Sequence, residues 1–390
     1  MTIITPEIIE IIEALRPDKT MVVGGAVRDF LLGEISADID IATSATPEVV
    51  TTRLQDKLNA QVIPTGLKHG TVTVVYKDHS YEVTTLRQDM STDGRHAQVE
   101  FTRDFKLDAS RRDFTFNALY MDENSKITDF FNGEGDLKSG KVRFIGEASA
   151  RIQEDYLRIL RFFRFYGRVS PDPFVDAATK EALRDSAKLL RKLSSERITS
   201  ELLQILSTPH LLHSWQLLEE LQILTHIELG DFALDKLQKL LEIFPEERHE
   251  LLLLFCLYGD AKRLVKNKWL TFSNQQQKML KILDKEIHHA DLLDNPRQYC
   301  YKLGKDVYTW LVQLKAIKQP KALEILQEIK DFEPPKLPVA GADIIAQGIP
   351  QGAQVGRILD KVEQWWIKHN FPPREKCLEL IAGLVKNIEK

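Results

Sequence analysis

Met21-Val-Val-Gly24-Gly25-Ala-Val-Arg28-Asp29-Phe-Leu-Leu-Gly33, followed by Asp38-Ile39-Asp40, is the stretch that decides the fold of the N-terminal part. It predicts a strand, a glycine turn, a short helix over 26–32 and a second strand over 38–42. Side chains at i and i+2 of a strand share a face, a little under about 7 Å apart along the chain. Two carboxylates that close repel each other unless a cation lies between them, and hard divalent cations favour carboxylate oxygens. The sequence therefore predicts a metal site at Asp38 and Asp40.

The glycine turn adds a phosphate site to this prediction. Gly24 and Gly25 allow backbone N–H groups to approach an anion, and the helix after them points its positive end to the same place. Arg28 supplies a further positive charge. A purely structural turn is the alternative. The chain contains no P-loop consensus, and a dinucleotide-binding fingerprint fails because its third glycine is missing.

Two further groups of residues carry candidate chemistry. In Ser110-Arg111-Arg112-Asp113-Phe-Thr-Phe-Asn117, paired arginines beside an acid and an amide could clamp phosphate and bind ribose hydroxyls. A surface ion pair next to an apolar helix explains the same residues equally well.

The second group is Glu154-Asp155-Tyr-Leu-Arg158-Ile-Leu-Arg161-Phe-Phe-Arg164, which we expect on a helix over 152–165. Asp155, Arg158 and Arg161 recur every three residues and would share one face. The first two could hydrogen-bond to the Watson–Crick edge of a base, with Arg161 and Arg164 reaching phosphates. A helix surface with salt bridges is the plain alternative.

Composition bounds the class of protein. The 390 residues suffice for two to four domains, and 43% hydrophobic with 28% charged residues is ordinary for a globular protein. The three cysteines are far apart, which indicates free thiols in a reducing cytoplasm. The longest strongly apolar stretch, 251–258, is too short to span a bilayer, so we expect no membrane partner.

The net charge of −4 does not by itself indicate a nucleic-acid partner. Residues 296–330 hold seven lysines and arginines against three acids, with Tyr299, Tyr301, Tyr308 and Trp310 interleaved. A basic RNA-binding surface and a solvated helical face over an aromatic core both fit. The charge run alone favours the solvated face.

The chain changes character after about residue 149. Strand signals at 21–23, 38–42, 70–76 and 80–86 precede it, and long helices follow it. The polar stretch 87–104 indicates a mobile loop, and the proline-rich stretch 334–338 a linker. We therefore expect an α+β head of about 145 residues with a mixed or antiparallel sheet, followed by an all-helical remainder.

In their order and spacing, these motifs resemble the class II tRNA nucleotidyltransferases, the CCA-adding enzymes of the polymerase β-like superfamily, which include bacterial poly(A) polymerases. The likeness covers nearly the whole chain. It extends to a hinge motif at Asp129-Phe-Phe-Asn132-Gly133, a template-supporting motif at Ser195-Glu196-Arg197-Ile198…Glu201, and a tail motif at Pro338-Val-Ala-Gly341-Ala-Asp343…Gly352…Gly356. The resemblance implies a polymerase β-like catalytic head over 1–145, a helical neck with the templating motif over 146–206, a helical body over 207–333 and a tRNA-binding tail over 334–390.

The resemblance also implies an activity and its residues. It implies template-independent addition of CCA to the 3′ end of tRNA from CTP and ATP, with release of pyrophosphate and two Mg²⁺ ions held by Asp38 and Asp40. The nucleotide-binding residues that it implies are Gly24, Gly25, Arg28, Arg112, Asp113, Asp155, Arg158, Arg161 and Arg164. Glu82 is a candidate third carboxylate, for which a structural role is equally well supported.

Family members with other activities give the alternatives. The full-length segment 87–104 argues against a CC-only enzyme, and Thr65-Gly66-Leu67-Lys68-His69-Gly70-Thr71 lacks the basic residues typical of the poly(A) polymerases. An A-adding specialist and a catalytically silent RNA-binding protein remain open. The sequence predicts no particular oligomeric state.

Overall fold

The computed structural model of this chain describes residues 2–36, 38–93 and 96–386. The chain forms two compact units, Met1–Phe232 with Asn267–Thr271, and Ala233–Lys266 with Phe272–Lys390. This division is coarser than the head, neck, body and tail of the sequence analysis, whose bounds stay a prediction.

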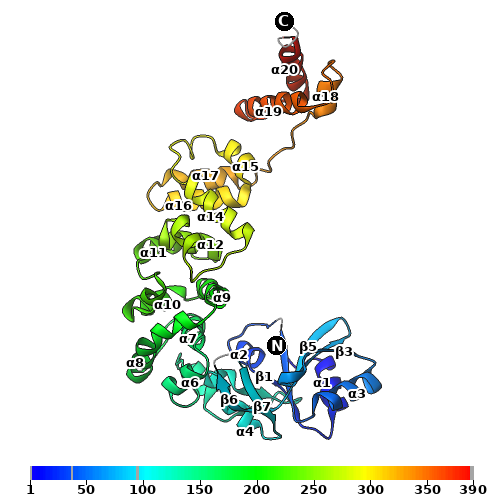
Figure 1. The fold of residues 1–390 in the computed structure, drawn as a ribbon, viewed down its shortest axis with the longest axis vertical. Helices are drawn as coiled ribbons and strands as arrows, with labels where there is room; N and C mark the ends of the chain where they lie inside the picture. The colour runs from blue at the N-terminus through cyan, green and yellow to red at the C-terminus, as the bar shows by residue number, and fades with distance from the viewer. Residues whose placement is uncertain (1, 37, 94–95, 387–390) are drawn as a thin grey trace. The chain divides into compact units, whose positions relative to one another are not determined.

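A seven-stranded mixed sheet forms the centre of the N-terminal part (Figure 1). Its strand order is β3-β4-β5-β2-β1-β8-β9. Only β2 and β5 pair in parallel; the other neighbours are antiparallel. The bounds are β1 (Thr20–Val23), β2 (Ile39–Thr43), β3 (Gln61–Gly66), β4 (Thr71–Tyr76), β5 (His79–Thr85), β8 (Leu119–Met121) and β9 (Ile127–Asp129). The predicted α+β head with a mixed sheet is confirmed.

Short helices cover this sheet. Their bounds are α1 (Pro6–Leu15), α2 (Gly25–Leu31), α3 (Pro47–Leu58), α4 (Phe105–Ser110) and α5 (Gly133–Lys138). Helices α1 and α3 lie side by side (Figure 1). Met21 and Val23 of β1 join a buried cluster with Ala42, Phe105 and Tyr120, so α4 closes one face of the sheet.

The stretch 87–104 differs from the mobile loop that its polarity predicts. It contains a hairpin of β6 (Arg87–Asp93) and β7 (His96–Phe101), with residues 94–95 outside the described part. The hydrogen bonds of a two-stranded ribbon join backbone groups, so polar side chains do not prevent it. Hydropathy was therefore the wrong signal for this segment.

The predicted helix over 152–165 is interrupted. The structure has α6 (Ala148–Glu154) and α7 (Arg158–Tyr166), with Asp155 extended between them at φ −149° and ψ 109°. The Asp155 carboxylate accepts a hydrogen bond from the backbone N–H of Leu157 (3.0 Å), so its side chain competes with helical bonding. Asp155 therefore does not share a helix face with Arg158 and Arg161, and that expectation was wrong.

Three further helices belong to the first unit: α8 (Ala177–Ser186), α9 (Ser195–Leu206) and α10 (Leu211–Glu220). Helix α7 packs against α9 and α10. Its buried aromatic residues extend the core of the head, since Phe162 and Phe165 contact Phe114. Helix α7 is thus joined to the head by buried aromatic contacts.

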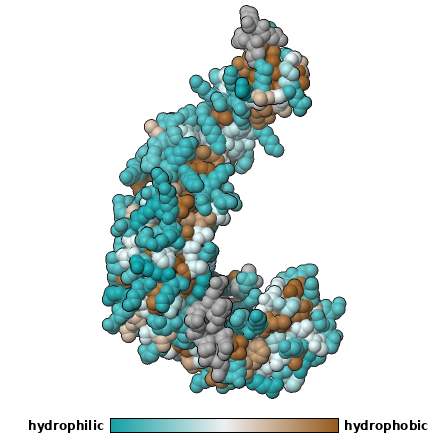
Figure 2. All heavy atoms as spheres, in the orientation of Figure 1, coloured by the Kyte–Doolittle hydropathy of each residue, from teal (hydrophilic) through white to brown (hydrophobic). Residues whose placement is uncertain are grey.

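In its described residues the second unit contains helices and no strands. Its helices are α11 (Leu234–Ile243), α12 (Glu250–Tyr258), α13 (Ala261–Lys266), α14 (Asn274–Glu286), α15 (Pro296–Leu303), α16 (Lys305–Ala316), α17 (Lys321–Ile329), α18 (Gly341–Ile345), α19 (Ala353–Lys368) and α20 (Arg374–Lys386). Tyr299, Tyr308 and Trp310 are buried, whereas Lys305 and Lys321 form ion pairs at the surface. The helices of this unit present a mainly hydrophilic face with apolar side chains between them (Figure 2). The aromatic residues Tyr299, Tyr308 and Trp310 of the segment 296–330 therefore belong to the helical core.

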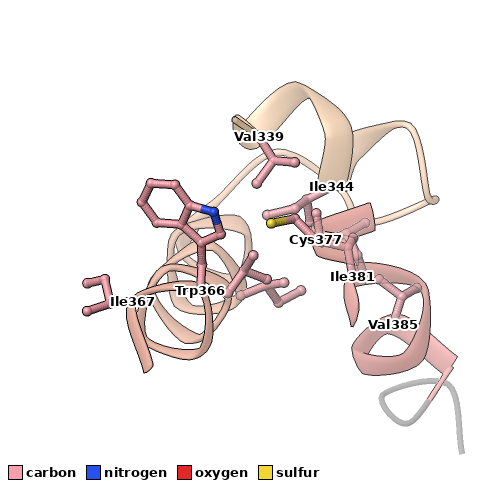
Figure 3. Packing of buried hydrophobic residues seen from close by; sticks show 10 residues of the cluster. Val339, Ile344, Trp366, Ile367, Cys377, Ile381 and Val385 are labelled. Atoms are coloured by element: carbon pink, nitrogen blue, oxygen red, sulfur yellow. The ribbon is translucent and has the colours of Figure 1, made fainter. Parts of the chain in front are cut away.

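Helices α18, α19 and α20 close around their own apolar core (Figure 3). Ile344, Trp366, Cys377 and Ile381 are buried in it. Asp343 accepts a hydrogen bond from the backbone N–H of Ala340 (2.8 Å) and so caps the start of α18. In the described residues, no helix of the chain is both long and apolar enough to cross a membrane.

Candidate active site

A cavity of about 470 Å³ in the first unit collects most of the predicted site residues. Its lining comprises Gly24, Gly25, Arg28, Asp40, Arg112, Asp113, Asn117, Arg161, Arg164, Phe165, Arg168, Gln204, Ser207 and Thr208. The lining residues come from α2, β2, the segment before β8, α7 and α9. Of the predicted residues, Asp38, Asp155 and Arg158 do not line it.

Gly24 allows an arginine to approach the turn before α2. Its φ is +74°, and a Cβ atom there would stand 3.0 Å from Nη1 of Arg112. A side chain at this position would meet both backbone strain and the guanidinium. The N–H of Gly24 donates to the carbonyl oxygen of Leu119 (3.0 Å). This group is therefore already bonded, and Gly24 acts by making room.

Arg28 is buried in the wall of the cavity and held by two partners. Its Nε and Nη2 lie 2.8 and 2.7 Å from Oδ1 of Asp29, and its Nη1 donates to Oδ1 of Asn117 (2.7 Å). Arg168 reaches the same Asp29 oxygen at 3.2 Å. Burial lowers the pKa of Arg28, while the charge of Asp29 opposes that shift. The guanidinium still stays charged at any physiological pH, so Arg28 presents a fixed cation.

Asp113 links the segment before β8 to α7. Its Oδ2 accepts from Nε of Arg161 (2.8 Å), and its Oδ1 accepts from Nδ2 of Asn117 and the N–H of Phe114, both at 2.9 Å. Burial opposes ionisation, but the Arg161 charge and these hydrogen bonds prevail and lower the pKa of Asp113 to about 2. Asp113 thus orients two other lining residues.

Arg112 is anchored by a residue that the sequence analysis missed. Asp108 is buried and accepts from the hydroxyl of Tyr120 (2.7 Å), from Arg111 (2.7 Å) and from Arg112 (3.4 Å). Burial opposes ionisation of Asp108, but the two guanidinium charges lower its pKa. The signal was present, because Asp108 precedes the two arginines by three and four residues, the spacings at which helical side chains can pair.

Phe165, also missed, stands among three guanidinium groups. The Cζ atoms of Arg28, Arg161 and Arg164 lie 5.0, 5.5 and 4.9 Å from the centre of its ring. A ring face attracts cations at such distances and so holds like charges together. Burial lowers the pKa of Arg164, and the Arg161 charge adds to that effect while Glu201 opposes it. Such a group of cations favours binding of a polyanion.

The arginines outnumber the acids in the lining. Arg28, Arg112, Arg161, Arg164 and Arg168 face the cavity together with two acids, Asp40 and Asp113. Gln204, Ser207 and Thr208 add uncharged polar groups from the α9 side. Their spacing along the sequence gives no indication that these three residues belong to the site.

The predicted acidic pair is divided between two environments. Asp40 is half-buried on β2, whereas Asp38 is exposed just before that strand begins. Glu82 on β5 lies directly opposite Asp40 in the parallel register. Burial, Glu82 and Asp38 raise the pKa of Asp40, with Arg112 acting in the opposite direction.

These carboxylates fit a divalent cation in their chemistry. The charge of Asp40 is disfavoured by burial and by negative neighbours, and a cation would relieve both effects. Carboxylate oxygens are the donors that Mg²⁺ prefers. Within the described residues, no group of three or more His, Cys, Asp and Glu side chains is already arranged around a common point.

Asp155 and Arg158 are held by residues that do not line the cavity. Nη2 of Arg197 donates to both carboxylate oxygens of Asp155, at 3.0 and 2.9 Å. Nη1 of Arg158 donates to Glu154 (2.6 Å) and to the carbonyl oxygen of Arg151 (2.8 Å). The groups predicted to meet a base are thus held by the protein in this structure.

Comparison with known proteins shows which proteins this chain is similar to. The model of the "Poly A polymerase head domain" matches residues 20–143, and that of the "Probable RNA and SrmB- binding site of polymerase A" matches residues 174–229. The CCA tRNA nucleotidyltransferase 1, mitochondrial, of Mus musculus is 37% identical over 383 residues, which are 94% of this chain and 86% of that protein. The CCA-adding enzyme of Lactobacillus helveticus is 32% identical over 88% of this chain and 87% of that protein.

Solved structures extend the likeness to the fold. The Bacillus stearothermophilus CCA-adding enzyme in complex with CTP aligns with a TM-score of 0.76 and 27% identity, over 99% of both chains. The Thermotoga maritima CCA-adding enzyme aligns with a TM-score of 0.66 over 98% of this chain and 96% of that one, with 21% identity, and so supports the fold alone. With relatives this similar along most of their length, the chain belongs to the family of CCA-adding tRNA nucleotidyltransferases.

Proposed function

We propose that this protein adds CCA to the 3′ end of tRNA, using CTP and ATP and releasing pyrophosphate. The observation that carries the proposal is the cavity in which Asp40 faces five arginines. A nucleoside triphosphate is a polyanion whose transfer needs positive charge at the leaving group and carboxylates for a metal ion. Membership of the family indicates that the acceptor is RNA.

The reaction forms one bond and breaks one. The 3′ oxygen of the RNA bonds to the α-phosphorus of the nucleotide, and the bond from that phosphorus to the oxygen bridging to the β-phosphorus breaks. Pyrophosphate leaves with the electron pair, and the 3′ hydroxyl proton passes to solvent or to a nearby base. Arg28, Arg161 and Arg164 would bind the triphosphate and balance the charge on the departing pyrophosphate.

In this proposal Asp38 and Asp40 hold Mg²⁺, and the cross-strand position of Glu82 makes it a further candidate ligand. When bound, the ion supplies Lewis-acid polarisation and neutralises phosphate charge. The protein's own contribution is to place Asp40 at the wall of the cavity, with Arg112 close enough to influence its charge. Gly24 and Gly25 keep that wall free of side chains.

Selection of the base is assigned to Asp155 and Arg158. Their donors and acceptors have the right type to meet a Watson–Crick edge. For this role the two side chains exchange their present partners, Arg197 and Glu154, for the base.

We also propose a cytoplasmic location, on the basis of three free, buried cysteines. Cell fractionation tests the location directly.

The activity test uses purified protein with tRNAs that end before CCA, after C and after CC. Each tRNA is incubated with labelled CTP or ATP in the presence of Mg²⁺. Incorporation of both nucleotides in the order C, C, A supports the proposal. Incorporation of ATP alone, only on tRNA ending in CC, identifies an A-adding specialist. Absence of incorporation with retained tRNA binding identifies a silent RNA-binding protein.

A further inference from the structure

Two segments that serve different parts of the proposed site are joined by one buried arginine. Arg151, on α6, donates from Nη2 to the backbone carbonyl oxygens of Arg111 (2.5 Å) and Arg112 (2.6 Å). Its Nη1 donates to Glu154 at 2.8 Å. One guanidinium thus holds two consecutive carbonyls of the segment before β8 and the acid that ends α6.

Arg158 strengthens the same junction from α7. Its Nη2 donates to the carbonyl oxygen of Arg111 (3.3 Å), and its Nη1 shares Glu154 with Arg151. The carboxylate of Glu154 therefore lies between two guanidinium groups, with contacts of 2.6 Å on each side. The fork of an arginine can bind several acceptors in fixed directions, which a lysine ammonium cannot do.

The two segments have separate roles in the proposed function. Arg112 and Asp113 line the cavity, and the proposed function assigns them to the nucleotide's sugar and phosphates. Asp155 and Arg158 flank the break between α6 and α7, where the base is to be selected. Arg151 lies nine-tenths buried between the two. It binds the backbone of the lining residue Arg112, but Arg151 itself does not line the cavity and, in this proposal, does not touch the substrate.

We propose that Arg151 is a positioning residue that keeps the base-selecting segment Glu154–Arg158 in register with the sugar- and phosphate-binding segment Arg111–Asp113. The inference rests on the proposed function. It predicts that base discrimination and nucleotide affinity fail together when this single side chain is changed, although neither part of the site is altered.

The test compares Arg151→Lys and Arg151→Ala with wild type in single-nucleotide addition to tRNA lacking CCA. KM and kcat are measured for CTP and for UTP, and rates are normalised to the fraction of active enzyme. We expect the CTP-to-UTP preference to fall, and KM for CTP to rise, by about tenfold or more, the effect of one lost charge-assisted hydrogen bond. Lysine should not rescue either quantity, because it cannot hold both carbonyls and Glu154 at once.

Arg53→Lys is the matched control. Nη1 of Arg53 also binds a backbone carbonyl, that of Leu15 (2.6 Å), and a carboxylate, that of Asp18 (2.8 Å), but Arg53 does not line the cavity. It should lower the melting temperature without changing nucleotide preference. If wild type is active and both Arg151 variants keep the preference and KM of wild type, the inference is overturned and the proposed function stands. If wild type itself incorporates neither CTP nor ATP, the proposed function fails.

Discussion

Asp40 on β2 and Glu82 on β5 are cross-strand neighbours in the register of the one parallel strand pair of the sheet. Their mutual repulsion, added to burial, raises the pKa of Asp40. A carboxylate in this setting is destabilising by itself and favourable only once a cation arrives. The arrangement therefore couples the stability of the fold to occupation of the proposed metal site, which can be measured.

We predict that Asp40→Asn abolishes nucleotide addition and raises the melting temperature of the metal-free protein at pH 7. A raised pKa means that ionised Asp40 opposes folding above the ordinary value of 3.8. The gain should therefore disappear as the pH falls below about 3.8, where Asp40 is protonated both folded and unfolded. Thermal unfolding in EDTA across this pH range measures the effect.

Two further measurements complete this test. Mg²⁺ should stabilise wild type but not Asp40→Asn, because a ligand stabilises only the state that binds it. The affinity for tRNA should be unchanged in the variant. Asp56→Asn, on the exposed side of α3, is the control. It should change neither nucleotide addition, nor the melting temperature, nor the stabilisation by Mg²⁺. A loss of tRNA affinity in Asp40→Asn would show that the aspartate has a structural role instead.

Glu82 offers a second test of the same carboxylates. If Glu82 contributes to the metal site, Glu82→Gln should raise the Mg²⁺ concentration required for half-maximal activity by about tenfold, as metal-site partners commonly do. It should also lower the pKa of Asp40, because one negative neighbour is removed. Glu181→Gln, on the exposed surface of α8, is the control. An unchanged Mg²⁺ dependence would show that Glu82 has only a structural role in the sheet.

The parts of this site that the sequence predicts are those that lie close along the chain. Gly24, Gly25, Arg28 and Asp40 form one continuous strand–turn–helix–strand unit, and periodicity with turn chemistry suffices to place them. The order of the motifs then identified the family. Local signals also sufficed for the mixed sheet and the change to helices.

The remaining features depend on contacts that no local pattern records. Asp113 and Arg161 pair across 48 positions of sequence, and Phe165 meets Arg28 only because α7 packs on the head. The break at Asp155 was missed because the apolar period continues through it, while the side chain forms a competing hydrogen bond. Intrinsic helix propensity is too weak to maintain a helix where such a side-chain hydrogen bond competes with it.

Asp113→Asn should destabilise the protein by about 2 kcal/mol at pH 7, the value of a pKa lowered from 3.8 to about 2. Because the folded-state pKa is the lower one, this stabilisation is complete above about pH 3.8 and is lost as the pH falls toward 2. Thermal unfolding of wild type and variant should thus converge at acidic pH. A constant difference down to pH 2 would mean that shape, and not charge, holds Arg161.

Arg197→Ala should relax base selection. The variant frees both carboxylate oxygens of Asp155, which Arg197 holds at 3.0 and 2.9 Å. An unrestrained Asp155 can meet a wrong base, so the CTP-to-UTP preference should fall by about tenfold, while KM for CTP changes less. Arg191→Ala is the control, since Arg191 donates to the His226 carbonyl (2.6 Å) at the surface. Equal losses for all nucleotides would contradict the role of Asp155 in selection.

Phe165→Leu should weaken triphosphate binding without removing any charged group. The ring lies within 5.5 Å of three guanidinium carbons, those of Arg28, Arg161 and Arg164. Each such contact contributes about 0.5–2 kcal/mol, so their loss should raise KM for both CTP and ATP by about tenfold. Phe144→Leu is the matched control, because its ring is equally buried but packs on Phe114 and Phe162. Both variants should lose similar thermal stability, and only Phe165→Leu should lose nucleotide affinity. Equal KM values in the two variants would show that the ring merely fills the core, and that the arginines hold their positions through Asp29, Asp113 and Glu201 alone.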